Sequence, residues 1–106
     1  MLYFDPNVLV EIITNGENAE KAKQIYETII DKELYVYEIH LGIVLAKLER
    51  KHYDYAKTFA NAIKKLNIKL LHIDIKKLVE LWAQLGSIEK AVFEIAKREG
   101  YEIVTI

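Results

Sequence analysis

At 106 residues the chain is sized for a single domain, and with 52% hydrophobic and 29% charged residues it is expected to fold around a core. Its formal net charge of −1 gives no overall positive field toward nucleic acid, so binding of that kind would need a local basic strip. The absence of cysteine excludes disulfides, zinc–thiolate sites and cysteine nucleophiles.

No apolar run approaches membrane-spanning length, and the start lacks the basic-then-apolar pattern of a signal peptide. We therefore expect a cytoplasmic protein with no membrane partner. Lysine, glutamate, isoleucine and tyrosine are abundant and methionine is scarce, a bias that is typical of thermophile proteins.

The first stretch predicts a buried strand that ends at an acid and turns directly into a helix. Residues 2–4 are apolar, Asp5 and Pro6 follow, and apolar residues dominate again over 8–13. Asp5 would lie at the carboxyl end of a central strand, where open α/β sheets place their sites. Asp before Pro is also a strong signal for the start of a helix, so a capping role for Asp5 stays open.

The rest of the chain alternates predicted helices and strands, with Gly86 and Gly100 where left-handed helix ends are wanted. In chain order we predict helix 19–31, strand 34–37, helix 38–52, helix 53–66, strand 69–73, helix 75–85, helix 88–99 and strand 101–106. This order predicts a three-layer α/β/α fold with a central parallel four-stranded sheet in one domain, residues 1–106.

Three acids fall at one edge of that predicted sheet. Asp5 follows the first strand, Glu38 follows the second, and Glu89 lies in the first turn of the last helix. Three converging carboxylates would repel one another unless a divalent cation joined them. Mg²⁺ or Mn²⁺ suits carboxylate oxygens and waters, and can activate a water for attack on a phosphodiester. Alternatively, Glu38 and Glu89 only complement helix dipoles.

Three stretches together resemble a PIN domain. The start LYFDPNVLV (2–10) is similar to that family's opening, where a strand ends in Asp and a Ser or Asn follows two residues later. The segment EIHLGIVLA (38–46) is similar to its second acidic block. The end EKAVFEIAKREGYEIVT (89–105) resembles its third block, which runs from an acid through a helix and a Gly to a strand ending in Val-Thr.

The resemblance implies a PIN-like domain acting as a metal-dependent endoribonuclease, a hydrolase that is often the toxin of a toxin–antitoxin pair and commonly dimeric. Asp5, Glu38 and Glu89 would be the catalytic residues and the ligands of Mg²⁺ or Mn²⁺, with Asn7 and Thr105 as polar supports. The chain departs from the family in three ways. Glu89 replaces an Asp, Pro6 stands where Thr or Ser is common, and the acid that usually follows Val-Thr by two residues would fall beyond Ile106.

Other polar residues have weaker interpretations. Arg50 and Lys51 belong to a basic strip that is expected either to track an RNA backbone or to be a solvated helix end. His40 is expected at the surface or partly buried, because residues two apart on a helix do not face the same way and Glu38 takes the site. His72 is expected in the core, and Trp82 in the core or in a dimer face.

Three hypotheses follow. The first is a PIN-like ribonuclease with RNA as its substrate, an antitoxin as its partner and a homodimeric assembly. The second is a degenerate PIN-like binding or dimerisation module without catalysis. The third is an unrelated small α/β protein whose acids are all caps.

Overall fold

The computed structural model describes residues 1–106, and its centre is a sheet of four parallel strands in the order β3-β2-β1-β4. The strands are β1 (Leu2–Phe4), β2 (Leu34–Tyr37), β3 (Ile68–Leu71) and β4 (Glu102–Val104). The helices are α1 (Asn7–Ile13), α2 (Ala19–Ile29), α3 (Glu38–Lys51), α4 (Tyr53–Lys65), α5 (Ile75–Leu85) and α6 (Ile88–Arg98). The predicted fold class is confirmed: helices cover both faces of an all-parallel sheet.

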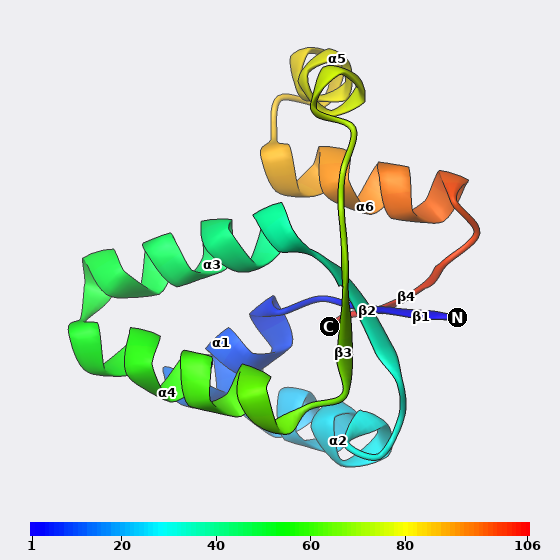
Figure 1. Cartoon of the computed structure of the whole chain (residues 1–106). Coiled ribbons are helices and arrows are strands. Elements are labelled where there is room, and N and C mark those ends of the chain that lie inside the picture. The colour runs from blue at the N-terminus through cyan, green and yellow to red at the C-terminus, as the bar shows by residue number, and fades with distance from the viewer.

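The two central strands form the middle of the core because both of their faces are covered by helices. Tyr3, Phe4, Leu34 and Val36 are fully buried, whereas the edge strands β3 and β4 are partly exposed. Figure 1 shows α6 on one side of the sheet with α5 outside it, and α1, α2 and α4 on the other side. None of the six helices has the length and apolar character that a membrane crossing requires.

The register of β1 brings the carboxyl ends of three strands to one edge. Leu2 aligns with Leu34 of β2 and with Glu102 of β4. The backbone N–H of Asp5 continues the ladder, donating to the carbonyl of Val104 at 2.9 Å. Asp5 is therefore fixed one residue past the end of β1, beside the end of β4.

Local signals set most helix ends. Asp74 accepts hydrogen bonds from the backbone of Lys76 and Lys77, and Ser87 accepts one from Lys90, as their capping positions predict. Gly86 and Gly100 adopt the predicted left-handed conformation, with φ of 72° and 88°. The sequence placed strand 101–106 too long, because only Glu102–Val104 pairs with β1.

Candidate functional site

A connected group of polar side chains, called here the acid site, lies at the carboxyl end of β1. Its members come from β1, α1, α3, α6 and the end of β4: Tyr3, Asp5, Asn7, His40, Lys47, Glu89 and Thr105.

Asp5 is buried and both of its carboxylate oxygens accept hydrogen bonds. Oδ1 accepts from the backbone N–H and from the side-chain amide of Asn7, each at 2.9 Å. Oδ2 accepts from the hydroxyl of Thr105 at 2.7 Å. The bond to the Asn7 backbone starts α1, so Asp5 serves the helix and belongs to the site at the same time.

Glu89 comes from the first turn of α6 and meets Asp5 through one shared residue. The Asn7 amide, 82 positions earlier in the chain, donates to Glu89 Oε1 at 2.8 Å while also donating to Asp5. Glu89 Oε1 also lies 3.2 Å from His40 Nε2, and Oε2 accepts from the Lys47 ammonium at 3.0 Å. The Lys47 Nζ is 3.5 Å from the Asn7 side-chain oxygen.

His40 is fully buried and holds one defined tautomer. The backbone N–H of Tyr37 donates to the Tyr3 hydroxyl at 3.2 Å, so the hydroxyl proton is free to point at His40 Nδ1, 2.9 Å away. Nδ1 is then an acceptor, and Nε2 carries the proton and donates a hydrogen bond to Glu89. The ring of Phe93 closes over His40 edge-on, with centroids 5.2 Å apart.

These contacts set the charges of the site. Burial lowers the pKa of His40, and this outweighs the nearby charges of Asp5 and Glu89, so the imidazole is neutral near pH 7. Burial alone would raise the pKa of Glu89, but hydrogen bonds from Asn7 and Lys47 and the positive charge of Lys47 lower it overall. Two carboxylates facing one ammonium leave an excess of one negative charge.

Glu38 lies outside the acid site. It begins α3, its side chain is 48% exposed, and its carboxylate pairs with His72 Nδ1 at 3.3 Å. The structure thus brings together two of the three predicted acids. His40 occupies the inward position instead, because it shares the buried side of α3 with Val44 and Leu48.

Four other expectations meet the structure as follows. His40 is fully buried rather than at the surface, and the His72 side chain is 90% exposed rather than in the core, so both of those predictions were wrong. Trp82 is 49% exposed, which excludes a core position. Arg50 and Lys51 are exposed at the end of α3, one turn beyond Lys47.

The acid site shows no arrangement of side chains that fits a divalent cation. No group of three or more His, Asp or Glu side chains is arranged to hold a metal ion. The four carboxylate oxygens of Asp5 and Glu89 already accept protein donors, and no buried side-chain nitrogen or oxygen lacks a partner. In this arrangement the residues fit the Lys47 ammonium and do not fit a divalent ion.

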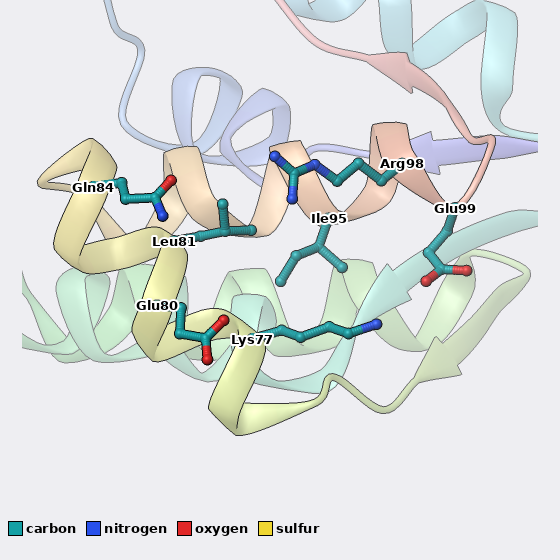
Figure 2. Close-up of a pocket in the computed structure, with 7 residues that line it drawn as sticks. All are labelled: Lys77, Glu80, Leu81, Gln84, Ile95, Arg98 and Glu99. Carbon is teal, nitrogen blue, oxygen red and sulfur yellow. The ribbon is translucent and has the colours of Figure 1, made fainter.

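Of the three hollows that border α6, one adjoins the acid site and another lies between α5 and α6. The first, of about 360 Å³, adjoins the acid site at Thr105 and is lined also by Lys90, Phe93 and Lys97. The second, of about 320 Å³, is the groove between α5 and α6 in Figure 2, where Leu81 and Ile95 form the floor. Its rim carries both signs of charge and consists of Lys77, Glu80, Gln84, Arg98 and Glu99. None of these residues belongs to the acid site.

Comparison of the chain with protein-family models, with curated proteins and with solved structures finds no match in any of the three. The PIN resemblance therefore rests on the residues of this chain alone. The sequence predicted Asp5, Asn7, Glu89 and Thr105 of the acid site, but Tyr3, His40 and Lys47 were missed. The signal for His40 and Lys47 was their seven-residue spacing, which places them on one side of α3.

Proposed function

We propose that the protein is a PIN-like binding module that pairs with a second copy of itself and does not cleave RNA. The observation that carries the absence of catalysis is the closed acid site. Asp5 and Glu89 have no carboxylate oxygen without a protein donor, and Lys47 supplies a positive charge beside them. Metal-assisted hydrolysis needs an open coordination position, which this arrangement does not offer.

The test of this part is RNA cleavage with Mn²⁺, comparing the wild type with Asp5→Asn. We expect no cleavage by the wild type above the level of the variant. Cleavage that requires Mn²⁺ and disappears in Asp5→Asn would overturn the proposal, provided that circular dichroism shows both proteins folded.

The surface that favours pairing is the outer side of α5 together with the first residue of α6, called here the α5 face: Ile75, Val79, Trp82, Leu85 and Ile88. Each of these side chains is 41–56% exposed, while Leu78 and Leu81 turn inward and are buried. Figure 1 shows α5 outermost on its side of the molecule, so nothing in the chain covers this face. Apolar side chains gathered on one exposed helix face are typical of an interaction surface.

A second copy suits the α5 face because the helix is complementary to itself when reversed. Helical periodicity in an antiparallel pair whose two-fold axis passes between Leu78 and Val79 places Ile75 level with Trp82 of the second copy. The same register brings Lys76 toward Glu80 of the second copy, and the two-fold axis repeats the contact. Both the apolar stripe and the charges beside it therefore favour a homodimer.

Sedimentation equilibrium tests the pairing. The wild type is expected to be a dimer and Trp82→Lys a monomer. Ile30→Lys is the matched control, since Ile30 has the same exposed fraction of 49% but lies at the end of α2. Lys76→Glu and Glu80→Lys are expected to weaken the dimer singly and to restore it when combined. A monomeric wild type would contradict the assignment.

A toxin-type ribonuclease is the second candidate, and the meeting of Asp5 with Glu89 favours it. In that case Mg²⁺ or Mn²⁺ would have to displace Lys47, exposed Arg50 and Lys51 would contact the RNA backbone, and an antitoxin would be the natural partner. Mn²⁺-dependent cleavage that falls in Arg50→Gln and Lys51→Gln would establish this candidate in the cleavage assay above.

A further inference from the structure

We infer that Lys47 is a built-in counter-ion that keeps divalent cations out of the acid site, and that removing its charge opens the site to them. The inference rests on the closed acid site of the proposed function and adds the part that the Lys47 charge plays in the closure. Lys47 is the one cationic side chain that contacts the acid site, through Glu89 Oε2 at 3.0 Å and Asn7 Oδ1 at 3.5 Å.

The fold holds Lys47 in place from both ends. Its backbone lies in α3, where Val44 and Leu48 anchor the helix in the core, and its ammonium reaches Glu89 on α6, 42 positions later. The side chain is 41% exposed, so its charge remains solvated while it contacts the carboxylate. Occupying this position therefore carries little of the desolvation cost of a buried ion pair.

A divalent cation at Glu89 would lie within a few ångströms of this ammonium and be repelled by it. Without the charge of Lys47, the site would hold two carboxylates, Asp5 and Glu89, with no cation beside them. Both belong to the hard oxygen class that Mn²⁺ and Mg²⁺ prefer, and the Thr105 hydroxyl oxygen adjoins Asp5. The two carboxylates already lie close together, because the Asn7 amide donates to Asp5 Oδ1 at 2.9 Å and to Glu89 Oε1 at 2.8 Å.

Calorimetric titration with Mn²⁺ tests the inference on the full chain. Lys47→Gln is expected to bind Mn²⁺ at least about tenfold more tightly than the wild type, because a repelling unit charge at contact distance is gone. Mn²⁺ is also expected to raise the melting temperature of Lys47→Gln and not that of the wild type. Lys51→Gln, one turn further along α3, is the matched control and is expected to behave like the wild type.

Two further variants fix the interpretation. Lys47→Arg keeps the charge and is expected to exclude Mn²⁺, and the double variant Lys47→Gln with Asp5→Asn is expected to lose the gain. Equal Mn²⁺ affinity in Lys47→Gln and the wild type would overturn the inference, as would a gain that survives the Asp5 change. If Lys47→Gln does not fold alone, folding restored by Mn²⁺ supports the inference, and folding that Mn²⁺ fails to restore overturns it.

These outcomes are separate from those of the proposed function. Cleavage of RNA by the wild type would end the proposal of a non-catalytic module. Absence of cleavage together with an unchanged Mn²⁺ affinity of Lys47→Gln would leave that proposal intact and end only the role of Lys47.

Discussion

The acid site and the α5 face differ in whether their side chains find partners within the chain. At the acid site, polar groups from five elements satisfy one another, and even the buried His40 has a partner on each ring nitrogen. On the α5 face, large apolar side chains such as Ile75 and Trp82 stay about half exposed with no partner in the chain. The polar groups of the acid site are therefore satisfied within the chain, whereas the side chains of the α5 face, one of which lines the hollow that adjoins the acid site, still lack a partner.

The largest expected effect is at Asp5. Asp5→Ala removes a buried carboxylate that accepts three hydrogen bonds, from the backbone N–H and the amide of Asn7 and from the Thr105 hydroxyl, so we expect a loss of about 3 kcal/mol in the free energy of unfolding. Urea denaturation measures it. Glu38→Ala is the comparison among the predicted acids and is expected to cost less than about 1 kcal/mol, because its pair with His72 is exposed. Equal losses would remove the distinction between the two acids.

Tyr3→Phe is expected to have the next largest effect. The change removes one oxygen but leaves His40 Nδ1 and the Tyr37 N–H unpaired, which is expected to lower the free energy of unfolding by about 1–3 kcal/mol. Tyr35→Phe is the matched control on the neighbouring strand, since its hydroxyl bonds the exposed Glu33. A larger loss in Tyr35→Phe than in Tyr3→Phe would show that the buried hydrogen bonds of the Tyr3 hydroxyl, with the Tyr37 N–H and with His40, do not stabilise the acid site.

The acid site is also expected to make folding sensitive to acid. The pKa of His40 in the folded protein lies below its ordinary value of 6.5, so the unfolded chain takes up the proton first and stability falls as the pH drops through 6.5. The pKa of Glu89 is lowered below 4.5, so its contribution is present above pH 4.5 and is lost as the pH falls through the folded value.

Urea denaturation across pH 8 to 3 measures both steps, with pH values chosen to span the ordinary pKa values of His40 and Glu89. His40→Gln keeps an amide donor toward Glu89 but does not titrate, so it should lose the step that begins near pH 6.5 and keep the one below pH 4.5. A wild type whose stability is flat between pH 7 and 5 would contradict the neutral, buried His40.

The smallest expected effects come from two glycines, one in the helix that carries His40 and Lys47 and one at the end of α5. Gly86 joins α5 to α6 with φ of 72°, so Gly86→Ala is expected to destabilise by about 1 kcal/mol through backbone strain alone. Gly42 lies within α3, where an added Cβ meets open space, so Gly42→Ala is expected to stabilise by about 0.5–1 kcal/mol. Thermal unfolding measures the change in stability of each variant. A change of the same sign in both would contradict these expectations.

Much of the fold could be predicted because its signals are local. Period-two and helical patterns, the caps Asp74 and Ser87, and the left-handed Gly86 each act over a few residues and each predicted its element. The order of those elements then restricted the sheet to parallel strands with helices on both faces. The placement of Asp5 and Glu89 at one edge followed from the same order.

The rest of the acid site could not be predicted, because it depends on how α3 is rotated against the sheet. The sequence shows Glu38 and His40 two residues apart, so only one of them faces inward. Packing of Val44 and Leu48 in the core turns His40 inward and leaves Glu38 with His72. No local sequence pattern predicts how α3 is rotated against the sheet.

The sequence by itself determined a parallel α/β fold with Asp5 and Glu89 at one edge, since short-range patterning and strand order are written in the chain. Only the tertiary structure decided what surrounds those acids. The Lys47 contact with Glu89 joins residues 42 positions apart, and the Asn7 bridge joins residues 82 positions apart. Contacts of that length arise from helix packing, and they are what distinguishes a closed site, whose carboxylates all accept protein donors, from an open cluster of carboxylates.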